Sequence, residues 1–518
     1  MKRTILIISS ILLTTAILAQ NRYDALKYSQ QFYEGSARSI AMGNAFTSIG
    51  GDLGVLSINP ASSAVYKYSE FQFTPSIAVS DNESHYIGNS SSDAMTKFGI
   101  SSLGYVSSFN TSKRSNKLLN LNLSFAINKL NNFNSRSSAN GRTSESSWLS
   151  DVAASVSGIK SSELDIQHEG DTYPYFSSGA PWRGVLAWNS NLLDLLPDSD
   201  KDYIAATENI IGNSIVIGGE LEQEFSRETT GGLSEFILNV SGNISNKFYF
   251  GASLGIQTLQ YEDFQRYSET AMNPAMFDSG FQNFSHVYKQ ETSGAGVNAK
   301  FGVIYTPVKG LRFGASIATP TYMSLTDEWY ERIYSKFSDG YNQSIFSPDG
   351  EYDYTVTSPM RFNLGVSYVF GNLGTISADY EGVDYSSIEM DEDESNGADF
   401  DEENRKISNE FDYVNNFRLG AEVRPVGNIA LRAGYSFYQN PEKNYGYDSE
   451  FFSFGAGIRT KRGIFADLGI QRRISKSENF SLYNDIKDPD TNITVMEAPI
   501  GKFDYSGWKF LLTIGFRF

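Results

Sequence analysis

The sequence predicts an all-β protein, a transmembrane antiparallel β-barrel of about fourteen strands. Two observations indicate this fold. Long segments alternate apolar and polar residues with a period of two, and the connections between them alternate between short and long. The predicted barrel carries an N-terminal hatch in its lumen and short helices in its extracellular loops. The chain accordingly divides into a signal peptide (1–19), a hatch (20–69) and a barrel (70–518).

Residues 1–19 have the pattern of a secretory signal peptide. Lys2 and Arg3 give a positive start, residues 5–18 are apolar apart from hydroxyl side chains, and Ala19 is a small residue at a cleavage site. There is no cysteine, which excludes a disulfide framework and a lipoprotein signal. No later stretch is apolar over the length that a helical membrane span requires.

Residues 35–64, "GSARSIAMGNAFTSIGGDLGVLSINPASSA", are small, rich in glycine and almost uncharged. A barrel of about fourteen strands is too wide for its own side chains to fill, so an empty lumen would leak. We therefore expect this segment to occupy the lumen, where its glycines and alanines allow close packing against the wall. Asn59 before Pro60 predicts a helix N-cap followed by proline at the first helical position.

The predicted strands place charged residues on one face only. In "LRAGYSF", Leu431 and Tyr435 face one way and Arg432 faces the other. Reversing the faces would put Arg361, Arg418 or Arg432 against lipid, at a cost of about 2–4 kcal/mol each near the midplane. The strands are expected near 70–80, 96–109, 117–130, 233–243, 246–264, 290–306, 310–328, 352–370, 373–386, 410–424, 428–439, 450–460, 463–475 and 505–518.

The connections sort by length. From the second strand onward every even-to-odd link is short, and every odd-to-even link is long and polar, as in barrels with periplasmic turns at one end and extracellular loops at the other. A string of soluble β-sandwiches would not sort its loops in this way. The expected tight turns are 244–246, 307–310, 371–372, 425–428 and 460–463. The expected long loops are 81–95, 131–232, 265–289, 329–351, 387–409, 440–449 and 476–504.

The loop 131–232 is long enough to need structure or function of its own. Its segments 147–156 and 181–198 look amphipathic and helical. They form either an exposed apolar groove that captures a greasy ligand or a cap that buries its apolar face over the barrel. The candidate capture residues are Trp148, Trp182, Leu186, Trp188, Leu193 and Leu196.

Three further features have plain interpretations. The acidic run 389–403 is expected to be a solvated loop, with loose divalent bridging to lipopolysaccharide as the alternative. Pro75 within the first strand marks either a bulge or a wall defect for lateral exit. His85, His168 and His286 lie far apart in the sequence and give no nucleophile–base spacing, so we expect no enzyme, no catalytic residue, no metal site and no cofactor.

The hatch segment resembles the N-terminal signature of the FadL/TodX family of outer-membrane transport proteins for hydrophobic compounds. The resemblance is carried by "SARSIAMGNAFTSIGGDLGVLSINPA" and extends more loosely to "TPVKGLRFGASIATPTYMSLTDEWY" and "RLGAEVRP". Asn44 stands where a second glycine is common, and Ser62 and Ser63 stand where Gly-Leu often follows. The matching motif residues are Ala37, Arg38, Met42, Gly43, Ala45, Phe46, Asp52, Asn59, Pro60 and Ala61.

This resemblance implies passive uptake of hydrophobic compounds, such as long-chain fatty acids, through a fourteen-stranded barrel of the Gram-negative outer membrane. It also implies that ligand shifts the hatch and leaves through a gap in the wall. Expected partners are the substrate, membrane lipid and lipopolysaccharide, and the protein is expected to be a monomer. The net charge of −18 argues against nucleic acid. The alternatives are a PorV-like barrel acting in protein secretion and a structural or adhesive barrel without flux.

Overall fold

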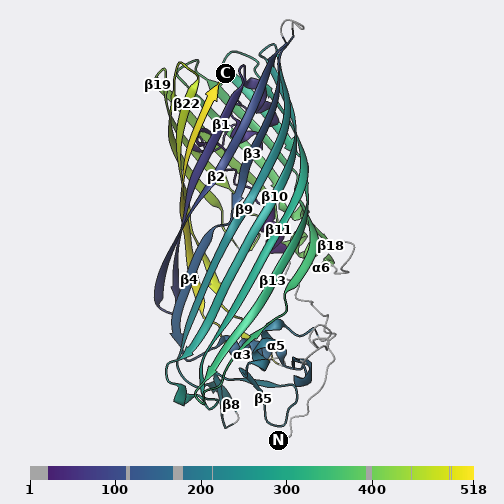
Figure 1. Cartoon of the computed structure of the whole chain (residues 1–518), viewed down its shortest axis with the longest axis vertical. Coiled ribbons are helices and arrows are strands. Elements are labelled where there is room, and N and C mark those ends of the chain that lie inside the picture. Colours follow the sequence, from purple (N-terminus) through teal and green to yellow (C-terminus); the bar gives the residue numbers. More distant parts are fainter. Residues whose placement is uncertain are drawn as a thin grey trace.

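Long antiparallel strands that close into a barrel dominate the computed structural model of the chain (Figure 1). The structure describes residues 21–111, 117–166, 179–212, 214–392, 400–444, 446–488, 491 and 493–518. Each strand of the barrel pairs with its sequence neighbour, and the last strand pairs with the first, so the ring closes. The described residues thus form the expected closed ring of fourteen strands.

Two members of the ring are broken near prolines. One is made of β12 and β13 on either side of Pro320, and another of β15 and β16 on either side of Pro359. Proline cannot donate to a strand ladder, which explains a break at each place. The ring comprises β1 (Glu70–Tyr86), β2 (Asn89–Asn110), β3 (Leu118–Asn132), β9 (Leu221–Ile244), β10 (Phe248–Ala271), β11 (Phe281–Tyr305), β12 (Leu311–Ala318) with β13 (Thr321–Phe337), β15 (Gly350–Ser358) with β16 (Arg361–Val369), β17 (Gly374–Asp384), β19 (Tyr413–Val426), β20 (Ile429–Tyr438), β21 (Ser449–Arg459), β22 (Ile464–Ser481) and β25 (Ile500–Arg517).

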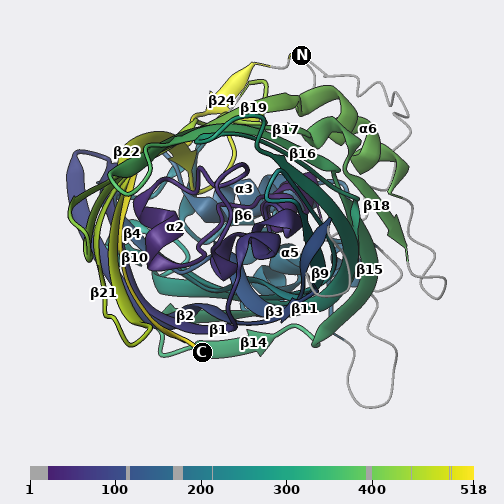
Figure 2. The ribbon, with the colours of Figure 1, turned by 90° about the horizontal axis from the view of Figure 1, so that it is seen from above.

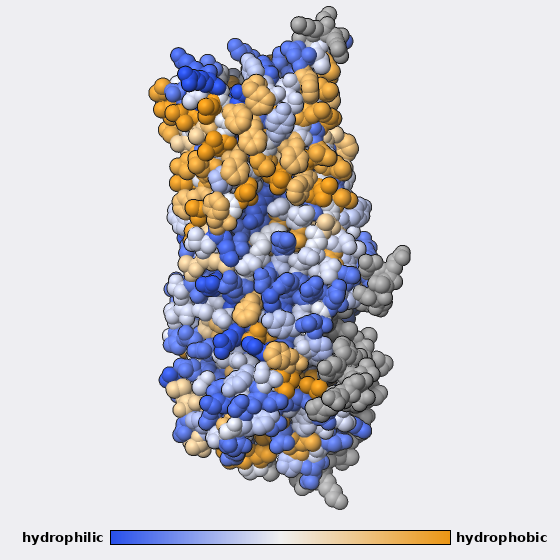
Figure 3. Space-filling model, viewed as in Figure 1, coloured by the Kyte–Doolittle hydropathy of each residue, from blue (hydrophilic) through white to orange (hydrophobic). Residues whose placement is uncertain are grey.

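The outward face of the barrel is apolar only near one end. In β10 the outward residues from Phe248 to Ile256 are apolar, whereas Thr258, Gln260 and Glu262 continue the same face with polar side chains. About ten residues of a tilted strand span a band of about 25 Å, the height of the apolar belt of a membrane barrel. Figure 3 shows this belt in the upper part of the molecule and a hydrophilic wall below it.

All fourteen predicted strands exist, but several segments that were expected to be loops belong to strands. Residues 81–95 lie in β1 and β2, which meet in a tight hairpin with positive φ at Ile87 and Gly88, and most of 265–289 lies in β10 and β11. Beyond the belt, the outward face meets water, so apolar residues no longer alternate with polar ones although strand pairing continues. The first connection, which was expected to be long, is consequently short. From the second strand onward the link lengths alternate as expected.

The two ends of the barrel differ as predicted. The five predicted tight turns lie at the end nearest the belt, together with the C-terminus (Figure 1). The long connections and the β1–β2 hairpin lie at the other end. Arg361, Arg418 and Arg432 point inward and are 3%, 0% and 5% exposed. In the described ranges no helix is long and apolar enough to cross a membrane.

The N-terminal segment, here called the hatch (20–69, described from residue 21), lies inside the ring (Figure 2). The expected N-cap is present, because the Asn59 side chain accepts a hydrogen bond from the Ala61 N–H at the start of a 3-10 helix. Asp52 caps a shorter 3-10 turn in the same way, through the Gly54 N–H. The hatch elements are α1 (Arg22–Ser29), α2 (Ala37–Ala41), η1 (Leu53–Val55) and η2 (Pro60–Val65).

The long insertion between β3 and β9 forms a cap at the end opposite the turns, near α3 and α5 in Figure 1. One expected helix is present as α3 (Trp148–Val156), but the other is shorter than expected, because α5 (Trp182–Asn189) gives way to a strand at Leu193. Besides these helices the insertion contains β4 (Ser135–Thr143), η3 (Ser161–Glu163), β5 (Leu193–Leu195), β6 (Tyr203–Ala205), β7 (Glu208–Ile211) and β8 (Ser214–Ile217).

The remaining connections also contain regular structure. The acidic run 389–403, expected as a solvated loop, begins with a strand paired to β15 and ends in the first turn of a helix, with 393–399 outside the described residues. Pro75 lies at a register shift between β1 and β2, which confirms the bulge. These elements are η4 (Pro274–Met276), β14 (Asn342–Phe346), η5 (Tyr385–Ser387), β18 (Glu389–Glu392), α6 (Asp401–Glu410), β23 (Ile486–Lys487) and β24 (Thr494–Met496).

We expect Leu254→Arg to lower the free energy of unfolding by about 2–4 kcal/mol, because it places a cation against lipid within the belt. Gln260→Arg is the matched control, since Gln260 is exposed on the same face of the same strand but beyond the belt. Denaturant unfolding in lipid vesicles measures both variants. Equal losses for the two variants would contradict the assigned position of the belt.

Candidate functional site

The inner wall approaches the hatch closely because glycine occupies inward positions on many strands. A Cβ on Gly434 would lie 2.1 Å from the Gly43 nitrogen, and one on Gly302 would lie 1.9 Å from the Asn59 side-chain oxygen. No real Cβ tolerates such distances, so only glycine fits there. The positions that face hatch atoms within 3.0 Å in this way, here called the wall glycines, are Gly104, Gly251, Gly302, Gly314, Gly365, Gly420, Gly434, Gly455 and Gly469.

Side chains of the wall hydrogen-bond the hatch backbone. Ser436 donates to the Gly43 carbonyl at 2.9 Å, and Ser316 donates to the Ile58 carbonyl at 2.6 Å. The Asp379 carboxylate accepts from the Thr47 N–H at 2.7 Å. A loop without regular structure needs such partners, because buried backbone groups are costly when they are left unpaired.

Each residue of the predicted hatch motif is buried and has a structural contact. The backbone carbonyl groups of Ala37, Met42 and Pro60 pack on wall glycines, and Ala61 lies beside Gly251. Gly43 adopts a positive φ of 61° where it meets β20. The structure therefore brings these residues together at the wall, where each of them packs or caps.

Arg38 links the hatch to a buried charge network in the wall. Its guanidinium lies 3.5 Å from Glu422 and donates to the Gly51 carbonyl. Glu422 also pairs with Arg432 at 2.7 Å, and Arg432 pairs with Asp467 at 2.7 Å. Moving Arg38 away would leave a buried carboxylate with fewer cationic partners, which is costly. The network therefore favours one position of the hatch.

The wall has a seam beside β2. This strand pairs with β3 only from Ser102 to Asn110, and the rest of its edge, 89–101, has no strand partner on that side among the described residues. After β3 ends at Asn132, the chain continues as β4. Among the described strands β4 pairs with β9 and not with β2. Side chains cross this seam, since Ser138 donates to Asp93 at 2.6 Å.

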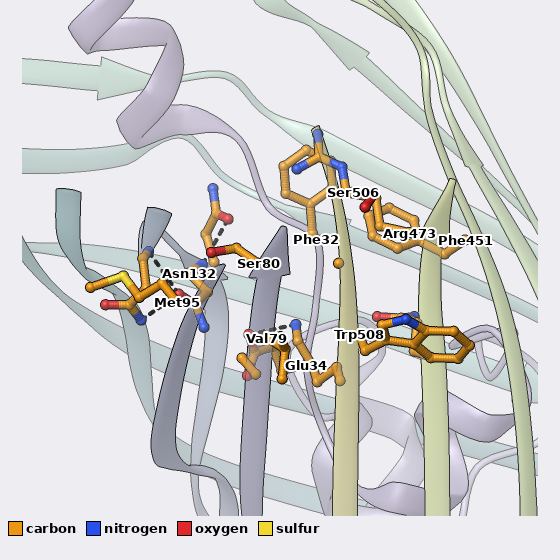
Figure 4. A pocket seen from close by; sticks show the side chains of 16 residues that line it. Phe32, Glu34, Val79, Ser80, Met95, Asn132, Phe451, Arg473, Ser506 and Trp508 are labelled. Atoms are coloured by element: carbon orange, nitrogen blue, oxygen red, sulfur yellow. Dashed lines mark hydrogen bonds and ion pairs between the residues drawn. The ribbon is translucent and has the colours of Figure 1, made fainter. Parts of the chain in front are cut away.

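A cavity of about 120 Å³ lies next to the seam, where Phe32 and Glu34 of the hatch face the wall. Figure 4 shows Phe32 and Phe451 grouped with Arg473 on one side and Met95 with Asn132 on the other. Lys509 pairs with Glu34 at 2.6 Å. Arg473 lies 6.0 Å from the ring centre of Phe32 and takes part in no ion pair among the described residues. Arg473 donates to the Ser449 hydroxyl at 3.1 Å. The cavity thus combines aromatic and other apolar side chains with polar ones and with a cation that has no acidic partner among the described residues.

Small inward side chains make the wall thin at this cavity, where Ala78, Ser80 and Gly507 line it. On the outer face of the same strands Trp508 is 41% exposed and ends the apolar row of β25. Phe98, on the seam edge of β2, is 75% exposed. Aromatic residues of this kind mark the boundary between lipid and water. The seam therefore lies at the outer edge of the belt.

The predicted capture residues lie in the cap, not at this cavity. Trp148, Leu186 and Leu193 are buried in a hydrophobic cluster with wall residues such as Phe284, on which the Trp148 ring stacks at 5.4 Å. Trp182 and Trp188 are partly buried against that cluster, and Leu196 is half-buried nearby. The described part of the helices packs its apolar face onto the barrel, and the capture role stays a prediction.

Sequence reasoning missed the cavity, because its lining comes from six strands and the hatch. Of the three histidines, His85 is exposed, His286 pairs with Glu331 at 2.7 Å, and His168 lies outside the described residues. Among the described residues no group of acidic, histidine or cysteine side chains is arranged to hold a metal ion.

Comparison with solved structures identifies the fold. The P. putida toluene transporter TodX matches with a TM-score of 0.53 at 13% identity, covering 94% of this chain and 99% of that one. A Pseudomonas aeruginosa FadL homologue matches with a TM-score of 0.54 at 12% identity, covering 93% and 98%. The chain has the FadL/TodX barrel fold.

A third structure with the FadL/TodX barrel fold is the Ralstonia pickettii toluene transporter TbuX, with a TM-score of 0.50, 13% identity and coverage of 94% and 99%. No family model matches the chain, and no curated protein matches it. The resemblance predicted from the hatch motif is thus confirmed at the level of the fold.

We expect Gly434→Ala to loosen the hatch, because the added methyl group would overlap the Gly43 backbone. The chain has no native cysteine, so Ser48→Cys, at a fully buried hatch position, can report this by thiol labelling. Labelling should accelerate about tenfold, which corresponds to about 1.4 kcal/mol of overpacking. Gly99→Ala is the control, since its Cβ would meet only the Ser76 hydroxyl at 3.8 Å. An unchanged rate in Gly434→Ala would contradict the close contact.

Proposed function

We propose that the protein is a channel of the Gram-negative outer membrane for passive uptake of hydrophobic compounds, such as long-chain fatty acids, and that its hatch gates it. The FadL/TodX barrel fold and the apolar belt support the location and the transport role. In this proposal the protein acts as a monomer in contact with outer-membrane lipid and lipopolysaccharide. It has no enzymatic step.

The cavity beside the seam is the observation that carries the proposal. It is lined by Phe32, Met95, Phe451 and Trp508, which suit an apolar body. Arg473 offers a cation to a carboxylate head group, because its guanidinium has no acidic partner among the described residues. A carboxylate head group with the first part of an alkyl chain matches both parts of this lining, and a volume of about 120 Å³ leaves the rest of a long chain to extend toward the seam.

The route runs sideways. The hatch packs on the wall glycines without space for a solute between them, so axial passage needs a hatch displacement. At the seam, in contrast, residues 89–101 of β2 pair with β1 but have no ladder hydrogen bonds on the β3 side within the described part of the chain, and the seam reaches the outer edge of the belt. A hydrophobic solute that leaves here enters lipid and does not cross water, which favours its exit.

Entry takes place from the capped end. The cluster around Trp148 closes that end, so ligand access requires the cap to open or a path along its edge. Trp182 and Leu193 remain the residues proposed for initial capture. In this proposal the apolar faces that now pack on each other are exposed to a ligand when the cap opens.

We expect Ala78→Phe to reduce uptake about tenfold, because its ring fills the cavity. Ala252→Phe adds the same volume on the lipid-facing side of β10 and is the control. Uptake of a fluorescent long-chain fatty acid into protein-containing liposomes is the measurement. No uptake by the unmodified protein, together with co-purification of secreted proteins, would reject the channel in favour of a secretion role.

Hatch gating can be tested by a reversible lock. The hydroxyl oxygens of Ser63 in the hatch and Ser241 in β9 are 2.7 Å apart, close enough for a disulfide in Ser63→Cys/Ser241→Cys. The oxidised variant should transport about tenfold more slowly than its reduced form, because a cross-link of about 2 Å prevents displacement.

The matched control links wall to wall. The hydroxyl oxygens of Thr74 in β1 and Thr513 in β25 are also 2.7 Å apart, so Thr74→Cys/Thr513→Cys cross-links neighbouring strands without a covalent link to the hatch. The Thr513 hydroxyl accepts a hydrogen bond from the Ala37 N–H of the hatch, so the oxidised form of this variant is compared only with its own reduced form. Equal transport by the oxidised and reduced hatch variants would show that the hatch does not move during uptake.

A further inference from the structure

The periplasmic mouth of the barrel, below the hatch, contains a cavity of about 280 Å³ lined by cations. We call it the cup. It lies on the opposite side of the hatch from the cap, where the strands end in tight turns. Its charged lining residues are Arg38 and Lys67 of the hatch, and Arg312, Arg424, Arg459 and Arg517 of the wall.

The wall arginines share one structural position. Arg312 is the second residue of β12, Arg424 lies two residues before the end of β19, and Arg459 and Arg517 end β21 and β25. Each points inward where its strand meets the turn end of the barrel. Four separate strands thus aim a guanidinium at the same space, and no carboxylate of the described residues lines it.

Ion pairs neutralise only part of this charge. Arg424 pairs with Glu422 at 2.7 Å, and Arg517 pairs with Glu70. Glu422 is shared, because Arg38 and Arg432 also bind it. The cup therefore holds more cations than its neighbouring carboxylates balance.

Two of the arginines are free of acidic partners. Arg312 donates to the Ile49 carbonyl, and Arg459 packs 5.8 Å from the ring centre of Phe465; neither forms an ion pair within the described part of the chain. Both are half-buried, so their guanidinium groups have lost part of their water. Like charges held this close together repel each other unless an anion lies between them.

The surrounding turns lack negative charge. The turn segments 244–248, 305–311 and 459–464 contain lysine or arginine, 369–374 and 426–429 contain no charged residue, and none of the five contains aspartate or glutamate. This is notable in a chain with a net charge of −18. The positive field at this end would draw anions toward the cup.

We propose that the cup binds a small anionic group, a carboxylate or a phosphate, from the periplasmic side. Planar guanidinium groups bind both groups through paired hydrogen bonds, and the cavity admits a group of that size. The anion is either a free ion or the head group of an amphiphile. This inference does not rest on the proposed uptake, because binding at the cup requires no flux.

Titration with inorganic phosphate tests the cup, using the full-length protein in a neutral detergent and calorimetry as the readout. Arg312→Gln/Arg459→Gln should weaken binding at least about tenfold, because it removes the two arginines without acidic partners. Arg459→Gln alone should weaken it in the same direction, and it keeps the Arg312 contact to the hatch in case the double variant does not fold.

The matched control is Lys461→Gln/Arg462→Gln, which removes two positive charges from an exposed turn outside the cavity. Binding by this control should stay within about twofold of the unmodified protein. Equal weakening in both double variants, or no phosphate binding by the unmodified protein, would overturn the proposal.

A competition arm identifies the source of the anion. Displacement of phosphate by dodecanoate but not by dodecanol indicates the head group of an amphiphile, whereas no displacement by either indicates a free ion. Liposome uptake by Arg459→Gln is measured in parallel, so a loss of anion binding with normal uptake separates the cup from the transport route.

Discussion

The contact between the hatch backbone and the glycine positions of the inner wall is the constraint on which the rest of the structure depends. At the wall glycines, hatch atoms come within van der Waals distance of the strand main chain. Backbone groups of the hatch at that contact need partners in the wall, and Ser316, Ser436 and Asp379 supply three of them. Hatch and wall therefore specify each other's shape.

Such packing has a consequence for gating. The hatch contacts the wall at nine glycine positions, so any displacement of the hatch loses many contacts at once. A gradual shift of the hatch is therefore unfavourable. The charge network of Arg38, Glu422 and Arg432 adds to this, since moving Arg38 leaves Glu422 with fewer cations. The hatch is thus expected to have discrete positions, in keeping with a gate that responds to ligand binding.

Much of the barrel could be predicted from the sequence because lipid enforces a simple rule. Within the belt each strand must put apolar residues outward, and a one-residue slip would put Arg361 or Arg418 in lipid. The strands and their tight turns follow from that rule. Beyond the belt both faces meet water or protein, so the rule no longer applies. For this reason no alternation of apolar and polar residues predicted β10 after residue 264 or β11 before residue 290.

The sites were harder to predict for a different reason. The glycines were visible on the polar faces, but their role depends on hatch atoms that lie far away in the sequence. Gly434, for example, packs on Gly43. The cup assembles arginines from four strands, and the cavity at the seam depends on where β3 leaves its partner. The local periodicity of a sequence carries no information about contacts between segments that lie far apart in it.

The hatch separates two chemically different spaces. On one side lies a mostly apolar cavity that contains Phe32 and reaches the lipid boundary through the seam. On the other lies the cup, whose lining is dominated by cations and faces the tight turns. A hydrophobic solute that leaves through the seam never meets the cup, and an anion in the cup never meets the seam. Arg38 connects them, because it lines the cup while it holds the hatch to Glu422. An anion bound in the cup would compete with Glu422 for that guanidinium, so occupancy of the cup and the position of the hatch are thermodynamically coupled.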